Sequence, residues 1–167
     1  MKKYELTEET VTVYGKTLYR IRAVRDFGSV KTGEFGGYIE KEENLSHFGN
    51  AWVSGNAWVF DNARVYDNAW VFGDAKVYGD AWVSGNAEVF NTMHFFVQGP
   101  IGSRNGFITF YRTKDDTVEV RCGCFSGSLQ EFVNQVEETH GGSRYEKEYK
   151  LAAELAKVCI RLEGESR

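Results

Sequence analysis

The chain contains 167 residues, with a formal net charge of −4 and an aromatic content of 15%. This length fits one domain or two small ones, and the aromatic content argues against intrinsic disorder. No run of about 18 apolar residues suggests a membrane span. Three cysteines without framework spacing, and a start without an apolar stretch, lead us to expect a cytoplasmic protein with no membrane partner.

The first segment, residues 1–35, is expected to form a β-hairpin that caps the rest of the chain. Residues 10–13 and 17–24 alternate between apolar and polar side chains, which is typical of half-buried strands. The short segment between them contains Gly15 and indicates a tight turn.

The second segment, residues 36–92, contains a six-residue repeat. Valine and alanine each recur seven times at this spacing, and a Gly or Asp followed by an Asn or Asp precedes most of the alanines. The repeated apolar residues are Val53, Val59, Val65, Val71, Val77, Val83 and Val89, with Ala51, Ala57, Ala63, Ala69, Ala75, Ala81 and Ala87. A branched residue points inward from each short strand, and Gly, Asn and Asp tolerate a tight corner. Three such units predict a parallel coil of 18 residues per turn, which Ile39 and Leu45 would begin.

The residues on either side of each valine are expected to point outward, and many of them are aromatic. Surfaces this rich in apolar side chains mark contact sites. We therefore expect a homotrimer, with an interface formed by Trp52, Trp70, Phe72 and Phe90. The alternative is that these aromatic side chains pack against the flanking segments of their own chain.

The third segment, residues 93–167, is predicted to be an α+β module of three strands and two helices. Strands are expected at 94–97, 107–112 and 117–122. Two capping boxes then indicate helix starts, Ser128 with Glu131 and Ser143 with Glu146. The first helix is expected to end near His140 and the second near Leu162. Apolar spacing predicts that one stripe of the second helix is buried, at Leu151, Leu155, Val158 and Leu162.

The repeat from Phe48 to Val89 resembles the hexapeptide-repeat family. The segments that lead into it, Arg25–Gly28, Gly36–Glu40 and Asn44–Ser46, look like those of hexapeptide-repeat proteins common in bacteriophage and prophage genomes. The C-terminal segment is similar to the tails of that group. The resemblance implies a mainly β fold: a short left-handed parallel β-helix with an N-terminal β-hairpin cap and a C-terminal α+β module. It also implies trimers, and a location in the host-cell cytoplasm.

The strongest candidate for a ligand- or partner-binding site is the predicted loop that follows residue 97. Glycine N–H groups can converge on an anion, and an arginine fork suits phosphate or carboxylate. The candidate residues are Gly99, Gly102, Ser103, Arg104 and Asn105. The alternative is a simple connection between two strands.

His47 is the candidate general base if the chain is an acyltransferase, an activity that the hexapeptide-repeat resemblance allows. It stands where the ladder would place a valine. However, no loop interrupts the repeat between Val53 and Val89, where those enzymes build a cofactor site. The histidine spacing fits no zinc site, and Cys122 and Cys124 are expected as small buried residues on one strand face. We expect no metal and no cofactor.

By resemblance, the expected function is that of a non-enzymatic, phage-encoded oligomeric binding protein. It would counter host defence by sequestering a nucleotide-type signal or by blocking a defence protein. An acyl-CoA-dependent acyltransferase and a structural trimerisation scaffold are the alternatives. Nucleic acid is not an expected partner, because no basic stripe is present to neutralise phosphates.

Overall fold

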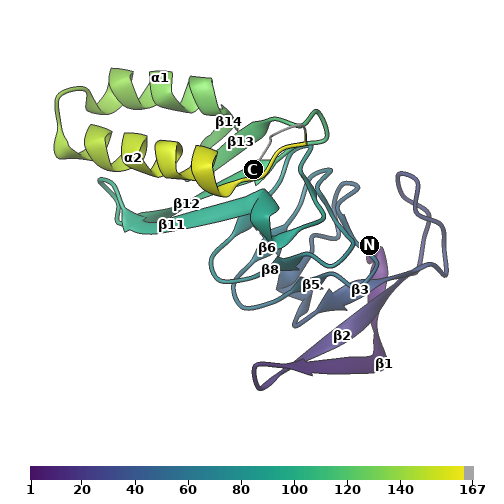
Figure 1. The fold of residues 1–167 in the computed structure, drawn as a ribbon. Helices are drawn as coiled ribbons and strands as arrows, with labels where there is room; N and C mark the ends of the chain where they lie inside the picture. Colours follow the sequence, from purple (N-terminus) through teal and green to yellow (C-terminus); the bar gives the residue numbers. More distant parts are fainter. Residues whose placement is uncertain (164–167) are drawn as a thin grey trace. The chain divides into compact units, whose positions relative to one another are not determined.

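The computed structural model describes residues 1–163 (Figure 1). The chain divides into two compact units, Met1–Thr92 and a second unit that begins at Met93. Strands dominate the described residues, and both α-helices lie in the second unit. The expected mainly β fold with a C-terminal helical module is therefore confirmed.

The strands of the first unit differ greatly in length. They are β1 (Tyr4–Val13), β2 (Lys16–Ala23), β3 (Phe35–Ile39), β4 (Trp52–Val53), β5 (Trp58–Val59), β6 (Arg64–Val65), β7 (Trp70–Val71), β8 (Lys76–Val77), β9 (Trp82–Val83) and β10 (Glu88–Val89). Short 3-10 turns occupy Glu42–Asn44 and Thr92–His94.

The two-residue strands of the repeat form parallel ladders between residues 18 apart. Val53 pairs with Val71, which pairs with Val89 in the same register. Successive strands from β4 to β10 belong to three sheets in turn. The chain therefore returns to the same sheet after every 18 residues. All seven ladder valines and seven repeat alanines are at most 1% exposed. Each fully buried valine contributes about 1.5–3 kcal/mol, so these ladders form the core of the first unit.

The first residue of each corner adopts the left-handed backbone conformation. The corner residues with positive φ are Gly55, Asp61, Asp67, Gly73, Gly79 and Gly85. Where aspartate takes this position, its carboxylate accepts a hydrogen bond from the N–H of the glycine one turn later. Asp61 accepts from Gly79, and Asp67 accepts from Gly85, each at 3.2 Å. These bonds offset the strain of a non-glycine residue there, which explains why the repeat accepts either residue.

The first turn of the repeat is two residues longer than the others. Ile39 pairs with Val59 and Leu45 with Val65, each 20 residues apart. The expectation that Ile39 and Leu45 begin the ladder is therefore confirmed. The placement of His47 in the valine position is wrong, because Leu45 occupies that position and His47 lies in the insertion that follows.

The N-terminal hairpin joins the repeat through strand β3. The sheet order β1-β2-β3-β5-β8 places the hairpin and two rungs of the repeat in one sheet. A Cβ on Gly36 would lie 2.5 Å from the carbonyl oxygen of Val53, and one on Gly37 would lie 2.6 Å from that of Ala57. The glycine pair thus allows β3 to approach the repeat closely. Segments 1–35 and 36–92 consequently belong to one compact unit.

The second unit contains a four-stranded antiparallel sheet rather than the three strands expected. Its elements are β11 (Phe95–Ile101), β12 (Gly106–Arg112), β13 (Val118–Cys122), β14 (Phe125–Ser128), α1 (Leu129–His140) and α2 (Arg144–Cys159). The sequence prediction missed β14 because Phe-Ser-Gly-Ser shows little apolar alternation. Gly123, with φ of 56°, makes the turn that pairs β14 with β13.

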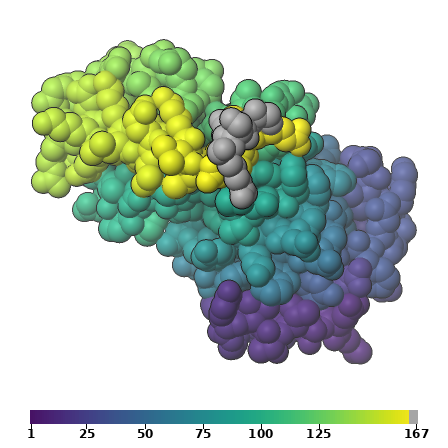
Figure 2. All heavy atoms as spheres, in the orientation of Figure 1, coloured from purple at the N-terminus to yellow at the C-terminus, as the bar shows by residue number. Residues whose placement is uncertain are grey.

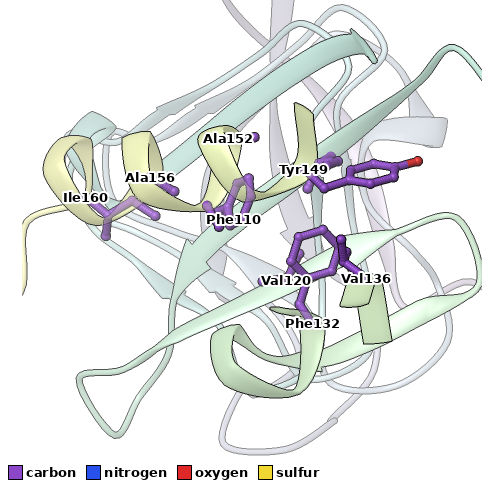
Figure 3. Close-up of a cluster of buried hydrophobic side chains, with 10 residues drawn as sticks. Phe110, Val120, Phe132, Val136, Tyr149, Ala152, Ala156 and Ile160 are labelled. Atoms are coloured by element: carbon purple, nitrogen blue, oxygen red, sulfur yellow. The ribbon is translucent and has the colours of Figure 1, made fainter. Parts of the chain in front are cut away.

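The buried face of α2 is not the expected stripe. Leu151, Leu155 and Val158 are 69%, 46% and 69% exposed. Of the four expected residues only Leu162, which lies beyond the helix end, packs against the core, and it is partly buried. The helix instead packs smaller residues and one tyrosine against the core, which Figure 3 shows. These are Tyr149, Ala152, Ala153 and Ala156, followed by Ile160 after the helix end. The alanines allow the helix to lie close to its neighbours, and the larger side chains remain outside.

The helix boundaries agree with expectation at one helix and differ at the other. Helix α1 begins after Ser128, whose Oγ accepts from the Glu131 N–H at 3.1 Å, and ends at His140. Helix α2 ends at Cys159 rather than near Leu162. Its expected capping box is also wrong, because Ser143 Oγ donates to the carbonyl of His140 at 2.6 Å.

Candidate functional site

The predicted anion-binding residues separate into a strand and a turn. Gly99 lies inside β11, where a Cβ would come 2.6 Å from the carbonyl oxygen of Gly106. Gly102, Ser103, Arg104 and Asn105 are brought together in the turn between β11 and β12. Within this turn, the Asn105 N–H donates to the carbonyl of Gly102 at 3.2 Å.

A carboxylate of the chain itself binds this turn. The Gly102 N–H donates to Glu148 Oε2 at 2.7 Å, and a Cβ on Gly102 would lie 1.8 Å from the hydroxyl of Tyr149. Both partners come from α2, so the turn is docked against the second unit's own helix. Burial raises the pKa of Tyr149 above its usual value. The geometry therefore fits the alternative expectation, a connection held by internal contacts, and leaves Ser103, Arg104 and Asn105 exposed.

His47 packs between the N-terminal strand and the first turn of the repeat. Its Nδ1 accepts from the backbone N–H of Lys3 at 3.2 Å, and its ring stacks on Tyr4 with centroids 4.2 Å apart. Its Nε2 lies 3.7 Å from Glu42 Oε2. Burial lowers the pKa of His47, opposed by the Glu42 carboxylate. Both ring nitrogens thus face the chain itself, whereas a general base needs a nitrogen that faces its substrate.

Two buried residues beside His47 were missed by sequence reasoning. Lys3 is fully buried, and its Nζ donates to the carbonyl of Ala51 at 2.6 Å and lies 4.8 Å from the ring centre of Phe27. Burial, reinforced by the charge of Arg25, lowers the pKa of Lys3 to about 8. A lysine this close to the start of a chain gives no sequence signal of burial.

Tyr4 is also fully buried. Its hydroxyl donates to the carbonyl of Leu45 at 2.7 Å, and burial raises its pKa. We call Lys3, Tyr4 and His47 the N-terminal clamp, because together they hold β1 against the repeat.

The proposed interface face is partly covered by the chain's own flanks. Trp52 is only 2% exposed, because Phe27 and Tyr4 pack against it with ring centroids 5.2 and 6.5 Å away. The expectation that Trp52 lies on an uncovered face is therefore wrong. Trp70, Phe72 and Phe90 remain half-buried, and the rings of Phe72 and Phe90 stack at 5.1 Å.

The other two faces of the repeat differ in how they are covered. On the face of β5 and β8, Phe60 is 3% exposed and packs with Val13 and Leu18 of the hairpin. On the face of β6 and β9, the Arg64 guanidinium lies 5.7 Å from the ring centre of Trp82, which is 37% exposed. Phe48, in the insertion before β4, is 81% exposed. The β6–β9 face thus carries the most exposed tryptophan.

The three cysteines are free thiols that differ in their exposure. Cys122 and Cys159 are half-buried and Cys124 is exposed, all as free thiols. The expectation that Cys124 is buried is wrong, because it lies in the turn between β13 and β14 rather than on a strand. Burial raises the pKa of Cys122. Within residues 1–163, no three His, Cys, Asp or Glu side chains gather where they could hold a metal ion.

Neither helix in the described part of the chain is long and apolar enough to cross a membrane. Searches with protein-family models and among curated proteins give no match for this chain. A function for this chain is therefore inferred from the geometry of its own residues.

Proposed function

We propose that the chain is a non-enzymatic, oligomeric binding protein built on a left-handed parallel β-helix of the hexapeptide-repeat kind. Three observations support this architecture: parallel pairing of residues 18 apart, rotation through three sheets, and left-handed corners at every hexad. The handedness of the coil is part of the proposal and follows from the resemblance of the repeat to that family.

The single observation that carries the oligomer is a row of half-buried aromatic side chains: Trp70 in β7, Phe72 directly after β7 and Phe90 directly after β10. Phe72 and Phe90 stack on each other, and Trp70 lies beside them on the same sheet. Such a row on a regular parallel ladder suits an apolar interface around a threefold axis, where the rows of three copies meet. We propose that three copies pack through Trp70, Phe72 and Phe90. Trp52 is not part of this interface, because Phe27 and Tyr4 of its own chain cover it.

We further propose that the partner is a protein rather than a nucleotide. A nucleotide phosphate would need the Gly102 N–H of the β11–β12 turn, but this N–H already donates a hydrogen bond to Glu148. The β6–β9 face instead offers Trp82 beside Arg64, a residue pair common in protein interfaces. Because the sequence resembles phage and prophage proteins, we propose that this face binds and blocks a host defence protein.

The acyltransferase alternative has lost its main support, because both ring nitrogens of His47 face the chain itself. The structural trimerisation scaffold differs from the proposal only in the role of the β6–β9 face. A scaffold would tolerate loss of Trp82, whereas a binding protein would lose its partner.

The oligomer is tested by sedimentation of Phe72→Glu beside wild type. We expect three chains per particle for wild type and single chains for the variant, because a charge would enter an apolar interface. Phe35→Glu is the matched control, since Phe35 is 50% exposed in the same unit but pairs with Arg22 of the hairpin and lies beside Arg20. A wild-type chain that sediments alone would contradict the proposal.

The partner is tested by purifying the tagged protein from host cells. We expect one host protein to be retained by wild type and by Phe35→Ala, and to be lost with Trp82→Ala. Titration with cyclic and ADP-ribose-type nucleotides should show no binding. Tight nucleotide binding, abolished by Arg104→Ala, would overturn this part of the proposal and restore the nucleotide-signal hypothesis.

A further inference from the structure

Two cysteines lie at the turn between β13 and β14. Strand β13 ends at Cys122 and β14 begins at Phe125, and these two residues pair across the turn. Only Gly123 and Cys124 lie between them. Gly123 has φ of 56° whereas Cys124 keeps a negative φ, which is the pattern of a type II′ hairpin turn. The two thiols are therefore one residue apart on a sharp reversal of the chain.

The backbone of this turn brings the two cysteines within the range of a disulfide bond. Successive Cα atoms are about 3.8 Å apart, and the bend at Gly123 holds the Cα atoms of Cys122 and Cys124 at about 6 Å. Cysteines joined by a disulfide have Cα atoms about 4.4–6.8 Å apart. A Cβ on Gly123 would meet no atom within 4 Å, so the turn has room to adjust. The turn can therefore close into a ring through its two sulfur atoms.

The two thiols differ in exposure, which suits two different roles. Cys124 is exposed, whereas Cys122 is half-buried and packs against the core of the unit. Thiol–disulfide exchange begins when an accessible thiolate attacks a disulfide, and a second thiol then displaces the half that remains bound. Cys124 is placed for the first step and Cys122 for the second. Cys159, the third free thiol, lies at the end of α2 and not in this turn.

The arginine of the β11–β12 turn lies at the same end of the sheet, because Ile108 near the start of β12 pairs with Cys122 at the end of β13. Burial raises the pKa of Cys122, and the charge of Arg104 opposes this effect. Arg104 is exposed, and its guanidinium joins no ion pair within residues 1–163. Figure 2 shows the β11–β12 turn, in teal-green, at the surface beside α2. The guanidinium is therefore open to a carboxylate of an approaching ligand.

We propose that Cys122 and Cys124 form a redox-active dithiol that exchanges with small disulfides bearing carboxylates, and that Arg104 binds the carboxylate. The Cys124 thiolate attacks one sulfur of the small disulfide, whose S–S bond breaks and releases a thiolate that takes up a proton. Cys122 then loses its proton, attacks Cys124 Sγ and displaces the second thiolate. The dithiol loses two protons and two electrons, and the small disulfide becomes two thiols. This exchange uses only the second unit and is independent of the proposed oligomer.

Oxidised glutathione, which carries carboxylates on both halves, is the probe. Full-length protein is incubated with it, the remaining thiols are alkylated, and intact and peptide masses are measured. We expect wild type to lose two hydrogens and retain no glutathione, with the bond mapped to Cys122 and Cys124. Cys122→Ser should instead retain one glutathione on Cys124, because no second thiol displaces it. Cys159→Ser is the matched control and should behave as wild type.

The role of Arg104 is measured in the Cys122→Ser background, where only the first step occurs. We expect Arg104→Ala to slow the reaction of Cys124 with oxidised glutathione by about threefold or more. Its rate with hydroxyethyl disulfide, a neutral probe, should not change. Equal rates with oxidised glutathione, with and without the arginine, would overturn this role.

The wild-type masses decide the dithiol without any variant. Glutathione retained on wild-type Cys124 would overturn the proposal, because Cys122 would then be out of reach. A bond from Cys122 to Cys159, or between two chains, would overturn it as well. Dithiothreitol should restore the original mass of the oxidised protein, since the exchange is reversible.

Discussion

Two periodic apolar patterns occur in this chain, and they differ in whether their side chains are buried. The valines of the repeat are completely buried, whereas the leucines of α2 are largely exposed. In the repeat, a corner with left-handed backbone follows every strand and fixes which side chains point inward. In α2, the periodicity defines a stripe but does not fix which stripe meets the core.

The difference teaches that size decides the buried face when two faces of a helix are apolar. Ala152, Ala153 and Ala156 let α2 approach the sheet and α1 closely, and the core is filled by Phe110 and Phe132 from those elements (Figure 3). A face of leucines would hold the helix farther away. The larger side chains Leu151 and Leu155 therefore remain exposed on the outer side of the helix.

The largest expected effect is that of a charge in the valine ladder. Val71→Asp buries a carboxylate between Val53 and Val89, which should lower the free energy of unfolding by about 4 kcal/mol or more. Urea unfolding followed by circular dichroism measures this change. Leu151→Asp on α2 is the matched control and should cost less than about 1 kcal/mol. Equal costs at the two positions would remove the contrast between the patterns.

A second test concerns the turn that docks against α2. Gly102 has φ of 78°, and a Cβ there would overlap the hydroxyl of Tyr149. Gly102→Ala should therefore lower the free energy of unfolding by about 2 kcal/mol or more. Gly142, with φ of 81°, has open space around it and provides the control. Its change to Ala should cost only about 1 kcal/mol.

The pH dependence of stability tests the N-terminal clamp. Burial lowers the pKa of His47, so the unfolded chain binds this proton more readily than the folded chain. The contribution of neutral His47 to the free energy of unfolding is complete above its ordinary pKa of about 6.5, and it decreases as the pH falls below that value. Burial of His94 in the second unit acts in the same direction.

We therefore expect the urea midpoint to fall between pH 7.5 and pH 5, and His47→Gln to make that fall smaller. Measurement of both proteins over this range decides the matter. A variant with the full wild-type slope would show that His47 does not contribute and that the clamp depends on Lys3 and Tyr4 alone.

The smallest expected effect lies on the exposed stripe. Leu151→Gln should change the free energy of unfolding of dilute protein by less than about 0.5 kcal/mol, because its side chain is 69% exposed. Thermal unfolding at low protein concentration measures this. A larger loss would mean that the stripe stabilises the single chain, and the contrast with the valine ladder would then be one of degree.

Sequence reasoning predicted the repeat well because each hexad repeats the same local chemistry. The corners at Gly55 and Asp61 and the valine ladders follow from spacing. The two-residue insertion before Val53 breaks that spacing at the first rungs, which is why spacing alone assigns His47 to a valine position. The clamp could not be predicted, because the burial of Lys3 and Tyr4 depends on contacts with residues more than 40 positions away. Trp52 was misplaced for the same reason.

The candidate binding loop shows a different limit. The sequence places Gly102 in a turn rich in possible anion donors, but it contains no signal that Glu148 supplies the anion from a helix 46 residues later. Residue types define what a loop can bind. Only the tertiary contacts show whether the chain itself provides that group.

The oligomer is the central claim, and the sedimentation mass of the wild-type chain tests it most directly. The 19.0 kDa chain should sediment as particles of three copies, and the Phe72→Glu variant should sediment as single chains. A wild-type protein that remains a single chain at every concentration would contradict the proposed interface of Trp70, Phe72 and Phe90.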